Sequence, residues 1–246
     1  MPGIFVSKGM TLAVPPGGLV LSLGQPTPPL VVHVHFDVCP TWCQLALAHS
    51  AEARTRADAR MIAWTGTDEN AKGAALEREF ESSMQAIMAA GIALDAFYAV
   101  INTHAQVPPS LSLKWREKRT PRYSQITEVL RIAFHLKPKG TAVLRKNLKE
   151  IFRFRDIAVH PSGRIEAPLL HAELDVGVEW RFAYFCARNA ESLVAAATGV
   201  MWELANNGKP TNPKIVRYMS TLRTRLTEVF PEGHLPGAVP ASDHGA

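Results

Sequence analysis

A long apolar stripe at helical spacing is the feature that most constrains the fold of this chain. Between residues 76 and 101, positions three or four apart fall on one face of a helix. They are Leu76, Phe80, Ser83, Ile87, Gly91, Leu94, Tyr98 and Ile101. A face of this length has to be buried against other helices. The stripe therefore predicts a helical bundle, and Gly91 indicates close packing with a neighbouring helix.

Further helical segments are expected before and after this one. Helix start and stop signals place them over residues 51–63, 121–136, 141–159, 176–206 and 213–230. Thr67 or Asp68 can cap the long helix, which ends before Pro108, and a basic loop is expected to follow. Gly208 acts as the C-cap glycine of the helix over 176–206. These signals predict a mainly α fold, an up-and-down bundle of four to five helices over residues 51–230.

The two ends of the chain differ from this bundle. The first 48 residues contain short β-rich runs at 4–6, 19–23 and 30–36, separated by Pro and Gly, as in hairpin strands. They predict a small β-rich appendage over residues 1–48. Residues 231–246 are rich in Pro, Gly and Ala and are expected to form a flexible tail.

The composition is that of a folded protein that does not enter a membrane. The chain has 246 residues, of which 47% are hydrophobic and 20% are charged. The most apolar later stretch, around 183–202, contains Arg188, Asn189 and Glu191, which argues against a membrane span. No secretory leader is recognisable, so we expect a cytoplasmic protein.

Three cysteines do not suggest a disulfide framework. Cys39 and Cys43 lie near His33 and His35, and cysteine with histidine can bind zinc. Their spacing is not that of a standard zinc finger, so two buried thiols beside strand histidines are the simpler interpretation. We expect neither a metal nor any other cofactor.

Positive charge is concentrated in one part of the chain. Residues 114–155 hold 13 Lys or Arg and 3 Glu, a balance of +10, whereas the whole chain carries +5. The densest group comprises Lys114, Arg116, Lys118, Arg119 and Arg122. Localised positive charge of this kind attracts phosphate backbones, although solvated helix faces rich in lysine look the same in sequence.

Arg155 is placed where a charge is costly. On the helix over 141–159, it lies at the centre of the apolar face, whereas Arg153 lies on the opposite, charged face. Desolvating an unpaired guanidinium costs several kcal/mol or more, so Arg155 is expected to meet an anion that is not part of its own chain. Pro161 disfavours helical geometry at His160, so the helix should stop at Val159 or His160.

The segment from Arg155 to His160, Arg-Asp-Ile-Ala-Val-His, resembles the signature of the HEPN family. These helical-bundle proteins include many RNA-cleaving toxins and defence factors. Their signature is an arginine, four to six intervening residues and a histidine at the end of a bundle helix, often with a polar residue after the arginine. The resemblance implies a HEPN-like bundle in which Asp95, on the stretch 93–98, lies near the arginine and histidine.

The resemblance also implies an activity, metal-independent RNA cleavage by the ribose 2′-hydroxyl. Histidine can move a proton near neutral pH and arginine is a permanent cation, as this chemistry requires. We expect His160 to act as acid or base, Arg155 to hold the phosphate and Asp156 to orient them. In this family two motifs face each other across a homodimer, and a toxin of this class has an antitoxin or another regulatory partner.

Two other interpretations fit the same residues. The protein could bind nucleic acid or nucleotides without cleaving them. It could also be a structural, partner-binding bundle in which Arg155 pairs with Asp95 and His160 caps the helix. Asp95 itself is either the partner of Arg155 or a border carboxylate that faces solvent.

Overall fold

The chain divides into a small N-terminal unit, Met1–Val38, and a helical unit, Cys39–Ala246. The structure is a computed structural model, and it describes residues 5–16, 18, 31–160, 163 and 165–234. Within the described residues the elements of the helical unit are α1 (Cys39–Trp64), α2 (Glu69–His104), α3 (Pro109–Glu117), α4 (Arg122–Phe134), α5 (Pro138–Val159), β3 (Leu169–Leu170), β4 (Gly177–Val178), α6 (Trp180–Tyr184), α7 (Ala187–Asn207) and α8 (Pro213–Val229). The predicted mainly α class is confirmed.

The N-terminal unit contains one antiparallel pair of strands. In it, β1 (Met10–Ala13) pairs with β2 (His33–Phe36), and Met10 lies opposite Phe36. The strand predicted within 30–36 is thus confirmed. The run at 19–23 lies outside the described residues, and Phe5 and Val6 are not in a strand.

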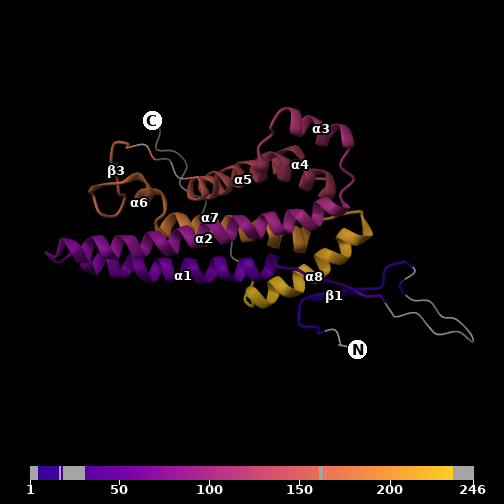
Figure 1. Cartoon of the computed structure of the whole chain (residues 1–246), viewed down its shortest axis with the longest axis horizontal. Helices are drawn as coiled ribbons and strands as arrows, with labels where there is room; N and C mark the ends of the chain where they lie inside the picture. The colour runs from indigo at the N-terminus through magenta and orange to yellow at the C-terminus, as the bar shows by residue number, and fades with distance from the viewer. Residues whose placement is uncertain (1–4, 17, 19–30, 161–162, 164, 235–246) are drawn as a thin grey trace, which may run out of the picture. The chain divides into compact units, whose positions relative to one another are not determined.

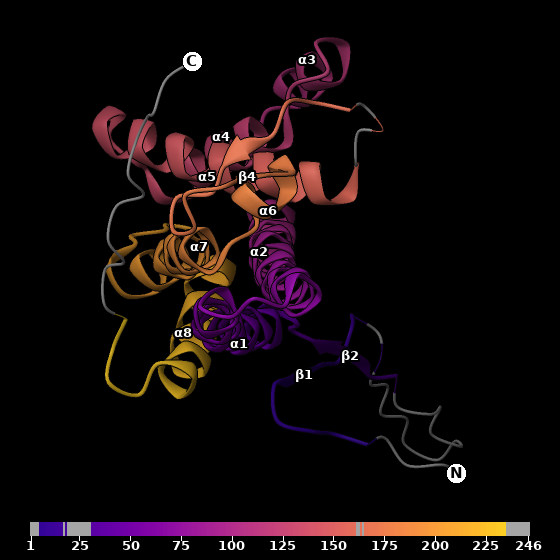
Figure 2. The same ribbon diagram turned by 90° about the vertical axis from the view of Figure 1, so that its left-hand side faces the viewer.

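Helix α2 is the centre of the helical unit. Helix α1 runs along one side of it, while α4 and α5 lie on the other side (Figures 1 and 2). The predicted stripe is buried from Ser83 to Ile101, and each buried Ile, Leu or Phe contributes about 1.5–3 kcal/mol. Asp68 caps the helix by accepting hydrogen bonds from the amides of Asn70 and Ala71.

By length and composition alone, α2 is apolar enough to cross a membrane. However, 56% of its most apolar window is buried inside the helical unit. A core helix of a bundle has the same composition, because it is apolar on most of its faces.

Three predicted boundaries are wrong. Helix α1 begins at Cys39 and not near residue 51. Pro40 is compatible with this start because it lies in the first turn, where proline is tolerated. The first part of the expected basic loop is helix α3, which begins at Pro109 for the same reason. The helix expected from residue 176 begins at Ala187, because the β3–β4 hairpin and α6 precede it.

Gly208 ends α7 for a reason other than the predicted one. Its φ of −64° is not left-handed, so it is not a C-cap glycine of the usual kind. A Cβ at this position would collide with the carbonyl oxygen of Leu204 in α7 itself and would lie 2.8 Å from Cδ1 of Phe134 on α4. Glycine is therefore needed here because both the last turn of α7 and α4 approach its backbone closely.

The C-terminal tail starts later than expected. His234 packs on α7: its Nε2 lies 2.8 Å from the hydroxyl of Thr198, and its ring stacks on Trp202 at 6.2 Å between centroids. Burial lowers the pKa of His234. Residues 235–246 of the predicted tail lie outside the described residues.

Candidate functional site

Arg155 reaches the site by passing over a glycine. Helices α2 and α5 pack together at Gly91, where an added Cβ would lie only 3.0 Å from Cδ of Arg155. The close packing predicted at Gly91 is confirmed. Because any larger residue would collide with the arginine stem, this glycine fixes the path of Arg155 across α2.

The guanidinium of Arg155 is held by two carboxylates of its own chain. Its Nη1 forms an ion pair with Asp95 on α2. Its Nε and Nη2 donate to Oδ1 of Asp156 at 3.2 and 3.0 Å, and the guanidinium carbon lies 4.5 Å from the centre of the Phe152 ring. The predicted contact between Asp95 and Arg155 is observed, and the expectation that Arg155 needs an external anion is wrong.

Asp95 also binds a second arginine. Nε of Arg122, the first residue of α4, donates to Oδ1 of Asp95 at 2.8 Å. The Arg122 guanidinium lies over the ring of Tyr98, 4.2 Å from its centre. Burial raises the pKa of Tyr98, an effect that the charge of Arg122 opposes. We call Asp95, Arg122, Arg155 and Asp156 the Asp95 cluster.

The Asp95 cluster has formal charges that cancel, but its hydrogen-bond donors are not all used. The side chain of Arg155 is 21% exposed and that of Arg122 is 39% exposed. Within the described residues, the terminal nitrogens of Arg122 donate no hydrogen bond, whereas all three nitrogens of Arg155 do. Arg122 is therefore better placed than Arg155 to contact an incoming anion.

His160 ends the helix as predicted. Helix α5 stops at Val159, and the backbone N–H of His160 donates to the carbonyl of Asp156 at 2.8 Å. The imidazole is exposed and has no hydrogen bond to another described residue. Pro161 lies outside the described residues. His160 thus shares the last turn of α5 with Asp156 and remains accessible to solvent.

The other predicted basic residues are exposed and lie outside the Asp95 cluster. Lys114 and Arg116 are on α3, and Lys118 and Arg119 follow it. Arg119 has a φ of 47°, in the left-handed region. None of the four forms an ion pair within the described part of the chain. Of the predicted nucleic-acid contacts, Arg122 is the one that the fold brings to Asp95.

A second arginine and carboxylate cluster was not predicted. Arg60 on α1, fully buried, forms ion pairs with Glu79 on α2 and Glu173 in the β3–β4 loop. Glu79 also accepts a hydrogen bond from the amide of Ala187, 2.9 Å away, at the start of α7. We call these residues and the neighbouring His171 the Arg60 cluster.

Burial and ion pairing act in opposite directions on the pKa of Arg60. On its own, burial would lower the pKa of Arg60, but the hydrogen bonds to Glu79 and Glu173 outweigh it and raise the pKa. Burial and the charge of Arg60 lower the pKa of His171. Nδ1 of His171 accepts a hydrogen bond from the amide of Glu173 at 3.3 Å, whereas its Nε2 is buried without a partner among the described residues.

The cysteines lie in the core. Cys39 and Cys43 on α1 are fully buried, and the thiol of Cys39 donates to Sδ of Met201 at 3.5 Å. Among the residues that the structure describes, no group of three or more His, Cys, Asp or Glu side chains is arranged to hold a metal ion.

Comparison of the chain with protein-family models, with curated proteins and with solved structures gives no significant match.

Proposed function

We propose that this protein is a HEPN-like endoribonuclease that cleaves RNA without a metal ion. The supporting observation is the ion pair between Asp95 on α2 and Arg155 on α5, close to the end of α5 where His160 is exposed. The HEPN resemblance implies this arrangement of an acidic residue, an arginine and a histidine on two helices of an up-and-down bundle. The exposure of His160 also supports the proposal, independently of the resemblance, because its imidazole has no structural partner among the described residues.

The reaction needs one proton removed and one supplied. The ribose 2′-oxygen forms a bond to phosphorus, the bond from phosphorus to the 5′-oxygen breaks, and the products are a 2′,3′-cyclic phosphate and a 5′-hydroxyl. A base takes the proton of the 2′-hydroxyl, and an acid protonates the leaving 5′-oxygen. His160 fills one of these roles.

The arginines of the Asp95 cluster stabilise the charge that develops on the phosphorane. Arg122 offers its terminal nitrogens, while Asp95 and Asp156 hold Arg155 in place. Preorganised donors of this kind are most effective when they need not rearrange during the reaction. Asp95 and Asp156 are thus positioning residues in this proposal.

A homodimer completes the proposed site. One protomer supplies one His160, whereas the reaction uses both an acid and a base. Two copies that meet at the ends of their α5 helices supply both imidazoles. Single-particle mass measurement at micromolar concentration tests this, and a purely monomeric protein that still cleaves RNA contradicts it.

RNA binding without cleavage is the second candidate. It is favoured by one observation: every nitrogen of Arg155 already donates to a carboxylate. In that case Arg122 and the exposed basic residues of α3 hold RNA, and His160 contributes no chemistry.

Incubation of purified protein with single-stranded RNA in EDTA separates the candidates. Cleavage by the wild type, lost in His160→Ala and retained in His35→Ala, supports the enzyme; His35 is a matched control because it is an exposed histidine of the N-terminal unit. Products are tested for a 2′,3′-cyclic phosphate. Cleavage that requires added metal, or that survives in His160→Ala, contradicts the mechanism.

Two arginine variants sharpen the assignment. Arg155→Lys keeps the charge but cannot reach Asp95 and Asp156 together, so we expect cleavage to fall at least tenfold. Arg122→Gln is expected to weaken both RNA binding and cleavage. If Arg122→Gln behaves as the wild type, Arg122 does not contact the phosphate.

A further inference from the structure

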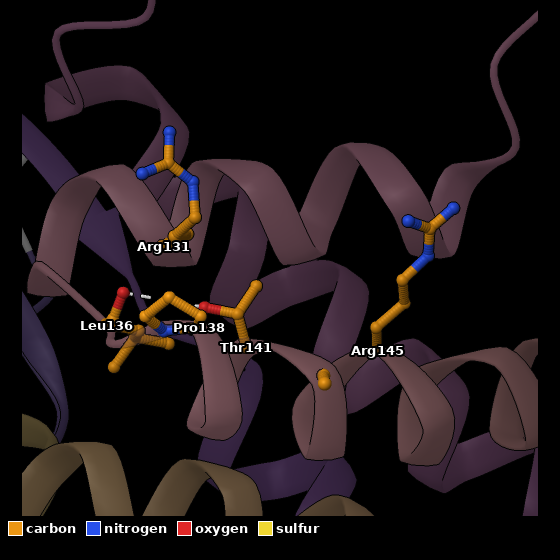
Figure 3. Close-up of a pocket in the computed structure, with 6 residues that line it drawn as sticks. Arg131, Leu136, Pro138, Thr141 and Arg145 are labelled. Carbon is orange, nitrogen blue, oxygen red and sulfur yellow. Dashed lines mark hydrogen bonds between the residues drawn. The ribbon is translucent and has the colours of Figure 1, made fainter.

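A shallow groove lies between α4 and α5, away from the Asp95 cluster. It has a volume of about 440 Å³ and is open to solvent. The groove is lined by Arg131, Leu136, Pro138, Thr141, Ala142 and Arg145. Figure 3 shows Arg131 and Arg145 at its two ends, with Thr141 between them.

The two arginines of the groove differ in how far their charge is neutralised. Arg131 donates two hydrogen bonds, of 2.9 and 2.6 Å, to the carboxylate of Glu128, so this pair has no net charge. Among the described residues, Arg145 makes one long contact, 3.5 Å, from Nη2 to the hydroxyl of Ser124. The positive field of the groove therefore comes mainly from Arg145.

Arg145 starts a line of cations that follows α5 towards His160. Arg145, Lys149 and Arg153 are spaced by four residues, which places them about 6 Å apart along the helix axis. All three are exposed. Arg153 is paired with Glu150 at 2.9 Å, while Lys149 forms no ion pair within the described residues. Arg145 and Lys149 are thus the two cations of this line whose charge is not neutralised by a carboxylate of the described residues.

We infer that this line, from the groove to the end of α5, binds the phosphate backbone of one RNA strand whose cleaved bond lies near His160. The inference rests on the proposed function and specifies its substrate: a single strand that extends well beyond the cleavage site. Arg145 lies fifteen residues before His160, or about 22 Å along the helix. A stacked strand needs roughly six nucleotides to cover this distance.

The shape of the groove favours a polymer over a small anion. The groove is open, and its two arginines lie on different helices and do not converge on one point; Lys149 and Arg153 continue from Arg145 along α5 beyond the groove. A single phosphate would meet one uncompensated charge there, whereas a strand meets several in sequence. Grooves that bind single strands combine positive charge along the backbone with tolerance of base sequence.

Binding of two RNAs tests the inference. The probes are a trinucleotide and a dodecanucleotide with 2′-O-methyl ribose throughout, which prevents cleavage so that only affinity is measured. We compare the wild type, the double variant Arg145→Gln with Lys149→Gln, and Arg217→Gln. Arg217 is the matched control because it is an exposed arginine on α8.

The expected result is a loss confined to the longer probe. The double variant should bind the dodecanucleotide at least several-fold more weakly, and the number of phosphate contacts obtained from the salt dependence should fall by about two. Its affinity for the trinucleotide, and the affinity of Arg217→Gln for either probe, should not change.

The outcomes separate this inference from the proposed function. Equal binding of the dodecanucleotide by the wild type and the double variant contradicts RNA binding along the groove. It does not affect the proposal that His160 acts as acid or base in cleavage. Loss of cleavage in His160→Ala supports the proposed function, and weaker dodecanucleotide binding by the double variant supports the groove. Failure of the wild type to bind the dodecanucleotide overturns the inference, whereas the proposed function is decided separately by the cleavage assay in EDTA.

Discussion

The Arg60 cluster and the Asp95 cluster are built from the same residue types and differ in exposure. Arg60 is fully buried and paired with two carboxylates, of which Glu79 also accepts a hydrogen bond from the start of α7. Arg155 is 21% exposed, and its neighbour Arg122 keeps terminal nitrogens without hydrogen bonds to described residues. An arginine in an apolar stripe is thus no sign of a binding site by itself. What distinguishes a candidate site is a cation with unused donors that solvent can reach.

The largest expected effect is on stability, at the Arg60 cluster. Arg60→Ala leaves Glu79 buried without its partner, and removing one member of a buried pair costs about 3–5 kcal/mol. Thermal unfolding should show a large fall in melting temperature. Arg54→Ala serves as the control, since Arg54 lies on the same helix and, among the described residues, forms only exposed ion pairs, with Asp58 on α1 and Glu191 on α7. A small shift for Arg60→Ala would remove the structural role of this cluster.

Asp95→Asn should have a smaller effect on stability and a clear one on binding. Its pairs are partly exposed, so we expect a loss of about 1 kcal/mol in the free energy of unfolding. Two arginines then lose their shared carboxylate, and RNA should bind more tightly while cleavage falls. Weaker RNA binding by Asp95→Asn would contradict the assignment of Arg122 and Arg155 to the phosphate.

Acidification should loosen the Arg60 cluster locally. Burial and Arg60 depress the pKa of His171 from its ordinary value of 6.5 in the folded protein. As the pH falls below that value, the opened state takes up a proton that the folded state does not, so the closed state loses stability. Below the pKa of His171 in the folded protein, further acidification neither increases nor reverses this loss of stability.

Hydrogen exchange measures this effect. The amides of Leu174 and Asp175 donate to the carbonyl of His171, and their protection factors should decrease from about pH 7 to about pH 5. His171→Gln should make protection independent of pH over this range. Unchanged protection in the wild type would show that His171 is not coupled to opening of the hairpin.

The smallest effect on stability is expected at Gly91. In Gly91→Ala, the gain in helix propensity of about 1 kcal/mol offsets much of the cost of displacing Arg155. Cleavage should nevertheless fall, because Arg155 has to move. Gly73→Ala is the control on the same helix, since an added Cβ there contacts nothing. Equal cleavage by both variants would mean that the path of Arg155 does not matter.

The core helices could be predicted because their signals are local. The stripe on α2, the Asp68 cap and the end of α5 at Val159 follow from spacing, one side chain and one proline. The start of α3 was missed because the prolines at 108 and 109 were interpreted as the end of a helix, although proline also occupies first turns. The start of α1 was missed because residues 39–48 were assigned to the β-rich segment. The β3–β4 hairpin was missed because its strands, of 2 residues each, are too short to show an alternating pattern.

The site was predicted in part. The contact between Asp95 and Arg155 was expected from the resemblance of the Arg155–His160 segment, because the spacing on α2 left Asp95 either paired or facing solvent. Arg60 could have been found by the reasoning used for Arg155, since it continues a spacing of three and four residues after Ser50, Ala53 and Ala57 on α1. Glu173 could not, because its contact with Arg60 spans 113 residues and depends on where the hairpin folds back.

His234 packs on α7 five residues after the end of α8 at Val229. Its ring covers Gly199 and stacks on Trp202, so a protein shortened to end at Val229 would expose an indole face to water. The fluorescence of such a protein should shift to the red. A fusion partner attached after Val229 would therefore be joined to a protein whose Trp202 is exposed. A partner attached beyond residue 234 leaves His234 packed on Trp202.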